Sequence, residues 1–418
     1  MKRNGTRLAA LSGVVALAAV VATVAMASTS TTSGTLATAA TCGGIPNKAP
    51  NDPTGILGTL GLDKNQIHYY TGWSHEIQKS VWANWKPSHA GPYKIAIVWG
   101  TVPNAFNAYT IKLIQKDLKV SPLINTNITV TTLSSATAIS EQLQQYEAAV
   151  AQKPDLIIFD PASPTAETPY IEQAGKQGIP TVAVFNATDS PYAVSIASNA
   201  YLSAATVASQ MAKDLDGQGN VLEVLGTPTA TTTIDERSAW QSVFSSCPGI
   251  KLVGSATGFY STAIAKTVVL QWLATHPGNV DGVMQTAAMA QGVLQAFLQA
   301  GKPVPVIGQV QAEKSVMGYW KANQAKGYKL AVDVAGADDM ADLISRVTLR
   351  ILAGQGPKVN TYPWKFVTLP IATLSNLTSS SWTPDTAGAI SAPKSTWYTK
   401  AELDRLFTHP KLTKGTRG

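Results

Sequence analysis

The strongest constraint on the fold is a regular alternation of short apolar segments with longer amphipathic segments from Tyr93 onward. Most of the apolar segments are continuous runs in which polar and apolar residues do not alternate, and the amphipathic segments carry apolar residues at three- and four-residue spacing. Continuous apolar strands that alternate with amphipathic helices are typical of a parallel sheet covered on both faces. We therefore predict an α/β fold. The clearest strand segments are YKIAIVWG, NITVTTLS, DLIIFD, TVAVFN, NVLEVLG, DGVMQT and VPVIGQ.

The alternation comes in two blocks, and a chain of 418 residues exceeds one ordinary hydrophobic core. We therefore predict two doubly wound parallel-sheet lobes joined by a multi-strand hinge. The hinge segments are expected at 195–199 and 332–336, with a third strand within 365–374. The predicted division is residues 93–197 plus 333–365 for lobe 1 and residues 198–332 plus 366–400 for lobe 2.

The N-terminus has the features of a secretory signal peptide at residues 1–27. A basic start, MKRNGTR, precedes an uncharged apolar stretch that ends in Ala25-Met26-Ala27, a small-x-small cleavage pattern. A membrane anchor is the alternative, because the stretch is nearly long enough to span a bilayer. Its Ala, Gly, Ser and Thr content favours the cleaved signal. We expect an exported, periplasmic or cell-surface protein.

The remaining flanking segments are assigned by composition. Residues 28–41 are rich in Ser, Thr and Ala and are predicted to be a disordered tether. Residues 42–92 form an N-terminal extension in which HEIQKSVWANW has the pattern of a short amphipathic helix. Residues 401–418 are predicted to be a basic C-terminal tail.

The net charge argues against a nucleic-acid partner. The formal charge is +7, and loss of Lys2, Arg3 and Arg7 with the signal peptide would leave +4. Lys411, Lys414 and Arg417 in the tail account for most of that remainder, so the globular part is nearly neutral. We expect a monomer.

The two cysteines leave three alternatives open. In an exported protein, Cys42 and Cys247 can form a disulfide that ties the extension to the body. The sequence AATC faintly resembles a lipidation motif, so Cys42 is also a candidate lipid anchor. Free thiols are the third alternative.

Polar side chains recur at the predicted strand ends. In open parallel sheets, ligands bind beyond the carboxyl ends of the strands. A single polar residue there is more often the cap of the following helix. A series of them favours a ligand cleft between the lobes. The series is Asn104, Asp160, Asn186, Thr286, Gln309 and Asp333.

No catalytic motif follows from the sequence. The chain has no GxGxxG after a strand, no Walker A loop, no GxSxG and no HExxH, and its five histidines are scattered. We expect no cofactor, no metal site and no enzyme activity. An enzyme on a similar sheet remains the least favoured alternative.

Two long phrases carry a family resemblance, QYEAAVAQKPDLIIFDPASPTAETPYIEQAGKQGIPTVAVFN and VSIASNAYLSAATVASQM. Together with the two-lobed pattern and the secretory signal, they resemble the periplasmic sugar-binding proteins of ABC transporters, specifically the ribose-type cluster. The resemblance covers Tyr93 to Gly354. It implies closure of two lobes around a sugar-like ligand and an ABC transporter permease as partner. A sensory binding protein for a membrane receptor is the alternative.

The resemblance also implies ligand contacts. In the loop TVPNAFNAY, Asn104 would bond the ligand, Phe106 would stack on it, and Asn107 stands where the family often has a second aromatic residue. Arg237 of DERSAW would reach into the cleft from a helix start and donate to hydroxyl or carboxylate oxygens. Tyr260 of GFYST matches an aromatic cleft position. Asp160, Asn186 and the pair Ser198-Asn199 match further family positions.

The second lobe departs from the family pattern. Thr286-Ala287 replaces an expected Asn-Asp, and Gly308-Gln309-Val310 replaces an expected Gly-Phe-Asp. Two carboxylates that grip sugar hydroxyls are therefore missing, and Asp333 is the expected substitute. The alternative is a ligand with fewer hydroxyls, or one with an anionic group that meets Arg237.

Overall fold

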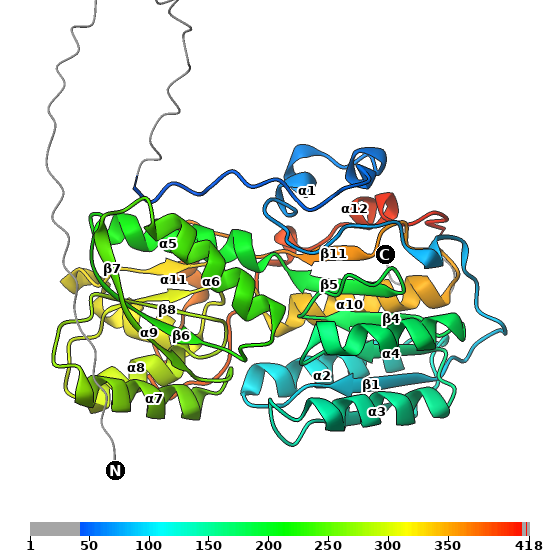
Figure 1. Ribbon diagram of the computed structural model, residues 1–418, viewed down its shortest axis with the longest axis horizontal. Helices are drawn as coiled ribbons and strands as arrows, with labels where there is room; N and C mark the ends of the chain where they lie inside the picture. Colours follow the sequence, from blue (N-terminus) through cyan, green and yellow to red (C-terminus); the bar gives the residue numbers. More distant parts are fainter. Residues whose placement is uncertain (1–41, 412–414, 416–418) are drawn as a thin grey trace, which may run out of the picture. The chain divides into compact units, whose positions relative to one another are not determined.

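Two all-parallel sheets form the framework of the protein in the computed structural model (Figure 1). The structure describes residues 42–411 and Gly415. The predicted signal peptide and tether, residues 1–41, and most of the end of the predicted tail lie outside the described residues. The described part forms one compact unit.

The first sheet is buried on both faces, which explains the continuous apolar strands. Helices α2 (Ala105–Lys119) and α10 (Ala337–Leu352) cover one face, and α3 (Ile139–Ala151) and α4 (Pro164–Lys176) cover the other. Alternate residues of a strand face opposite cores: Ile97 joins the α2/α10 side and Ala96 the α3/α4 side. The strand order is β11 (Thr361–Trp364), β5 (Ala193–Ser198), β4 (Thr181–Val184), β3 (Leu156–Phe159), β1 (Ile95–Trp99) and β2 (Thr129–Thr132).

The second sheet is wound in the same way. Helices α5 (Ala200–Asp214) and α6 (Thr231–Phe244) pack on one face, and α7 (Thr262–Thr275) and α8 (Ala290–Gln299) pack on the other. Helix α9 (Lys314–Asn323), followed by the short η3 (Gln324–Lys326), lies beside the β10 edge. The strand order is β10 (Ala331–Val332), β9 (Val306–Gln309), β8 (Gly282–Gln285), β6 (Gln218–Leu225) and β7 (Gly249–Thr257).

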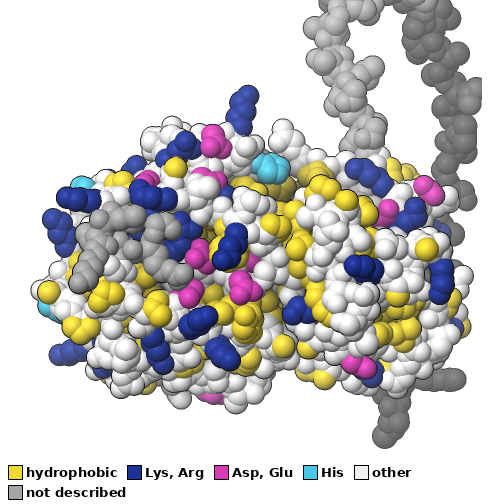
Figure 2. Space-filling model, turned by 180° about the vertical axis from the view of Figure 1, so that it is seen from behind, with side chains coloured by type: hydrophobic (Ala, Val, Ile, Leu, Met, Phe, Trp, Pro, Cys, Tyr) yellow, Lys and Arg dark blue, Asp and Glu magenta, His cyan; other side chains and the backbone are white. Residues whose placement is uncertain are grey.

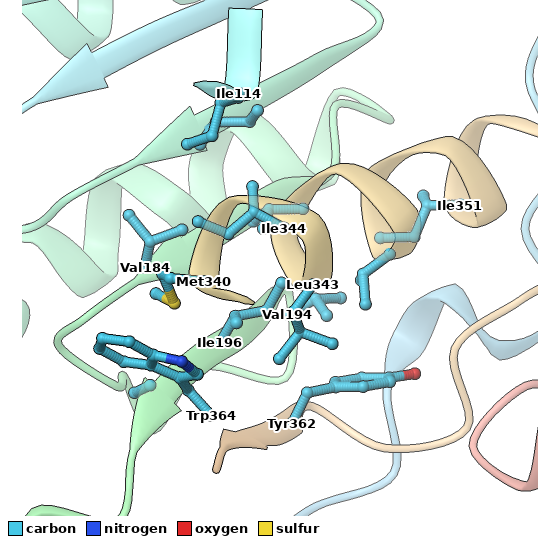
Figure 3. Close-up of a cluster of buried hydrophobic side chains, with 14 of the residues drawn as sticks. Ile114, Val184, Val194, Ile196, Met340, Leu343, Ile344, Ile351, Tyr362 and Trp364 are labelled. Carbon is cyan, nitrogen blue, oxygen red and sulfur yellow. The ribbon is translucent and has the colours of Figure 1, made fainter. Parts of the chain in front are cut away.

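The core of the first lobe is completed by chain that arrives after the second lobe (Figure 3). Helix α10 places Met340, Leu343 and Ile344 in one cluster with side chains of β4, β5 and β11. Tyr362 and Trp364 of β11 pair through their backbone with β5 and belong to the same cluster. The first lobe is therefore discontinuous in sequence.

Three segments connect the sheets, and they differ from the prediction in one respect. The chain crosses after β5, between β10 and α10, and after β11, where Val334 and Val367 form an antiparallel bridge. The predicted third strand does not extend through 365–374, because Ile371–Leu377 is helix α11. Pro370 precedes this helix, and its Leu374 is buried in the second lobe.

The N-terminal extension packs mainly against the first lobe. Its elements are η1 (Ile56–Thr59), α1 (Lys64–His68) and η2 (Val81–Asn84), and Leu57, Tyr70 and Trp82 are buried in the first-lobe core. The predicted amphipathic helix in HEIQKSVWANW is wrong, because only η2 is helical. Lys79 instead bridges to Val359, and the Trp82 indole N–H donates to the Tyr192 carbonyl oxygen at 2.7 Å.

The segment predicted as a basic tail also packs on the first lobe. After η4 (Lys394–Thr396), helix α12 (Lys400–Arg405) follows a capping box at Thr399. Leu403, Leu406 and Phe407 are buried in the first-lobe core. The prediction of a tail rested on the charged composition of the segment and overlooked these three apolar side chains.

A disulfide joins Cys42 to Cys247. Cys247 follows α6 in the second lobe, whereas residues from Leu57 onward pack on the first lobe, so residues 42–50 run from one lobe to the other (Figure 1). We call residues 42–50 the strap. With both sulfur atoms in this bond, the free-thiol alternative does not hold in the structure, and neither sulfur carries a lipid.

The distribution of charged side chains on the described surface agrees with the nearly neutral charge expected for the globular part. On the face in Figure 2, Lys and Arg side chains are spread over both halves and interspersed with Asp and Glu. No helix among the described residues has the length and apolar character that a bilayer-spanning segment needs.

We expect the disulfide to contribute about 2–4 kcal/mol to the free energy of unfolding, because it closes a long loop in the unfolded chain. Urea unfolding of the wild type and of the Cys42→Ser/Cys247→Ser double variant measures this difference. Reductant should destabilise the wild type and leave the double variant unchanged. Equal sensitivity of both proteins to reductant, or free thiols in the purified protein, would contradict the bond.

Candidate ligand-binding site

A cavity of about 120 Å³ lies between the lobes, beyond the carboxyl ends of both sheets. This is roughly ten times the space that one buried water needs. Side chains of both lobes line it. Seven of the residues predicted from the sequence are in its wall: Asn104, Phe106, Asn107, Asp160, Asn186, Ser198 and Tyr260.

The first lobe supplies an aromatic wall. Phe106 stacks on Trp364 with ring centroids 6.0 Å apart and lies 5.8 Å from Phe185, and Phe366 contacts Trp364 at 4.7 Å. Sequence reasoning identified only Phe106. Phe185 and Trp364 sit in or beside apolar strand segments, where an aromatic residue is indistinguishable from ordinary core.

Asp160 is the carboxyl group of the first lobe in the cavity wall. It follows β3, and its Oδ2 accepts a hydrogen bond from the Gly100 backbone N–H at 3.3 Å. The Gln142 side chain donates to the Asp160 carbonyl oxygen and holds this strand end. Burial raises the pKa of the Asp160 carboxyl to about 7, although the Gly100 N–H and the Asn186 side chain favour its charged form.

Glu236 of α6 is the carboxyl group of the second lobe, and sequence reasoning missed it. Its side chain lines the cavity, is 2% exposed, and has no hydrogen-bond partner at Oε2 among the described residues. Burial raises the pKa of Glu236 well above its usual range, and the negative charge of Asp235 raises it further. The Ala287 backbone N–H acts in the opposite direction.

Arg237 does not line this cavity. Its Nε and Nη2 atoms donate to the buried carboxylate of Glu223 at 3.2 and 3.0 Å. Successive residues of an α-helix point about 100° apart, so only one of the adjacent Glu236 and Arg237 faces the ligand space. The sequence singled out Arg237 of this helix, and the residue of the helix that lines the cavity is its neighbour Glu236.

The other three predicted residues also lie outside the cavity wall. Thr286 is fully buried and its hydroxyl has no partner among the described residues. The Gln309 side-chain oxygen accepts from the Glu313 backbone N–H at 2.9 Å. Asp333 accepts from Ser203 at 3.1 Å and from Thr368 at 2.5 Å, so it supports the hinge. The second-lobe carboxyl group that lines the cavity is therefore Glu236, and Asp333, the expected substitute, does not line it.

Several cavity residues connect the lobes directly. The Asn104 side-chain oxygen caps α2 by accepting from the Asn107 N–H at 3.0 Å, and its amide nitrogen donates to the Tyr260 carbonyl oxygen at 2.9 Å. The Thr232 hydroxyl donates to the Asn186 side-chain oxygen at 3.0 Å. The Asn104 side chain therefore caps helix α2 and also forms a hydrogen bond across the cleft to the second lobe.

Tyr260 is held by close backbone approach. Its φ of 57° is in the left-handed region, and its hydroxyl lies 2.6 Å from that of Thr233. A Cβ atom on Gly226 would lie 2.3 Å from the tyrosine Cζ, so only glycine leaves room for the ring. The ring closes the second-lobe side of the cavity.

Residues 95–355 match the family of periplasmic binding protein domains. The chain belongs to this family. The family resemblance and the two-lobed fold predicted from the sequence are thereby confirmed.

Among curated proteins, the xylitol-binding protein of Mycolicibacterium smegmatis is 28% identical over 185 residues, 44% of this chain and 53% of that protein. The chain thus spans about half the length of this relative. The ribose import binding protein of Bacillus subtilis is 24% identical over 56% of this chain and 74% of its own. Both relatives are named as binding proteins.

Among solved structures, an ABC transporter solute-binding protein from Thermobispora bispora has a TM-score of 0.63 and 25% identity, over 70% of this chain and 89% of its own. A solute-binding protein from Burkholderia graminis in complex with D-arabinose has a TM-score of 0.57 and 18% identity, over 70% of this chain and all of its own. The similarity to the arabinose complex shows a shared fold and nothing further.

The raised pKa of Asp160 predicts a pH-dependent stability. The unfolded carboxyl has a pKa of about 3.9, so between there and about 7 the folded state holds a proton that the unfolded state releases. Stability should fall as pH rises through this window, by up to about 1.4 kcal/mol per pH unit for this group. Urea unfolding at about pH 5 and pH 7 should show a weaker pH dependence for Asp160→Asn. An unchanged dependence in that variant would remove Asp160 as a cause.

Proposed function

We propose that the protein is an exported solute-binding protein that captures a small sugar-like molecule between its two lobes and delivers it to an ABC transporter. The observation that carries the proposal is the cavity between the sheets, with an aromatic wall from the first lobe and carboxyl groups from both. The relatives that are named for binding xylitol and ribose support a polyol or sugar as the ligand.

The cavity suits such a ligand in size and chemistry. Phe106 and Trp364 present aromatic surface to the ligand space, and aromatic faces pack against the C–H side of a sugar ring or polyol chain. Asp160 and Glu236 supply oxygen atoms for hydroxyl groups from opposite sides. A volume about ten times that of one water corresponds to a ligand of roughly ten non-hydrogen atoms.

Binding is coupled to closure of the lobes in this proposal. A ligand that contacts both Asp160 and Glu236 stabilises the closed arrangement relative to an open one, because it loses one set of contacts on opening. The permease then recognises the closed surface of a monomeric binding protein. Residues 1–27 direct export, and binding proceeds without turnover.

We expect a thermal-shift screen with pentoses, hexoses and polyols to give a saturable rise in melting temperature with at least one group. Phe106→Ala should weaken binding of that compound about 10- to 100-fold, because it removes stacking surface from the cavity wall. Calorimetric titration measures the change.

Tyr109→Ala is the matched control, since it truncates an exposed aromatic residue of the same helix that does not line this cavity. The control should bind as the wild type does. If no compound of the screen raises the melting temperature, or if Phe106→Ala binds undiminished, this cavity is not a sugar or polyol site.

A further inference from the structure

The polar groups in the cavity wall differ in whether they have a hydrogen-bond partner within the protein. Asn107 uses its side-chain oxygen to accept from the Trp99 indole N–H at 3.0 Å, and Asn186 donates to the Pro161 carbonyl oxygen at 3.0 Å. The Tyr260 hydroxyl pairs with Thr233. Glu236 Oε2, in contrast, is buried in the cavity wall without a partner among the described residues. The polar group of the cavity wall that is left without a partner is therefore a carboxyl oxygen.

No positively charged side chain in the described part of the chain compensates the carboxyl groups of Asp160 and Glu236. None of the residues that line the cavity is Lys, Arg or His. Arg237, next to Glu236 in the chain, is paired with Glu223. Lys48 and His75 interact with Asp235 and act to lower the pKa of its carboxyl group. The negative charge of Asp235 in turn raises the pKa of Glu236.

This charge pattern distinguishes among ligand classes. An anionic sugar acid would place a negative group in a buried space that already holds two carboxyl groups and is lined by no cation, which is strongly unfavourable. A neutral polyol can donate hydroxyl hydrogens to the carboxyl groups, but it does not offset the cost of ionising them in a buried space, which raises the pKa of both Asp160 and Glu236. A protonated amine donates hydrogen bonds and compensates the charge, and the faces of Phe106, Phe185 and Trp364 attract a cation as well.

We infer that the preferred ligand is an amino sugar or amino polyol whose protonated amine lies between Asp160 and Glu236. This inference rests on the proposed function, because it takes the cavity to be the ligand site. It narrows the ligand from any sugar-like molecule to one that carries a positive charge.

Matched pairs of compounds test the inference on the mature protein. D-Glucosamine is compared with D-glucose and with N-acetyl-D-glucosamine, and 2-amino-1,3-propanediol is compared with glycerol, by calorimetric titration below the pKa of the amines. We expect the amine of at least one pair to bind 10-fold or more tightly than its hydroxyl counterpart. N-Acetylation, which removes the charge, should abolish the gain.

Variants locate the amine. Glu236→Gln and Asp160→Asn keep the shape of each side chain and remove its charge, so each should reduce the amine preference toward a ratio of one. Glu147→Gln makes the same chemical change at an exposed position of α3 and should leave the ratio unaltered. The wild-type comparison alone decides the preference if a cavity variant does not fold.

The outcomes separate the two proposals. If a sugar or polyol binds and its amine counterpart binds equally or more weakly, the amine inference is overturned and the proposed function stands. If the preference persists in both cavity variants, the amine does not lie between these carboxyl groups. If neither class binds, the proposed function fails and this inference with it.

Discussion

The common direction of the strands is the constraint on which the rest of the structure depends. Every strand pair in both sheets is parallel, so each sheet presents all its carboxyl ends at one edge. The two edges face the same cavity, to which the chain contributes Asp160 after β3, Phe185 after β4 and Tyr260 after β7. A site assembled from so many separate loops requires no long insertion, because each loop has only to place one side chain.

The hydrophobic pattern was sufficient to predict the fold. The polar strand ends and the family resemblance gave eleven candidate residues, and seven of these line one cavity. The differences between the candidates and the cavity wall have physical causes. Arg237 and Glu236 are adjacent on α6, and the phase of a helix about its axis is set by tertiary packing. Trp364 lies in a strand whose burial is equally compatible with core and cavity wall. The extended backbone at Lys79 depends on pairing with Val359, far away in sequence.

The carboxyl groups of the cavity come from unlike positions in the two lobes. Asp160 follows a strand, as the parallel fold favours, whereas Glu236 projects from a helix. The second sheet ends in Thr286 and Gln309, which are turned into the protein interior. The carboxyl group of the second lobe thus enters the cavity wall from a helix, and its direction differs from the one that a side chain at a strand end would have.

The bond between Cys42 and Cys247 has a consequence for the protein's resistance to proteolysis. The chain between these residues contains the strap, most of the first lobe and the first helices of the second. A protease that cuts the backbone once within this ring leaves the two pieces covalently joined, and their packing can hold them in register. A cut in the exposed part of the strap therefore leaves the residues before the cut attached to the second lobe through Cys247.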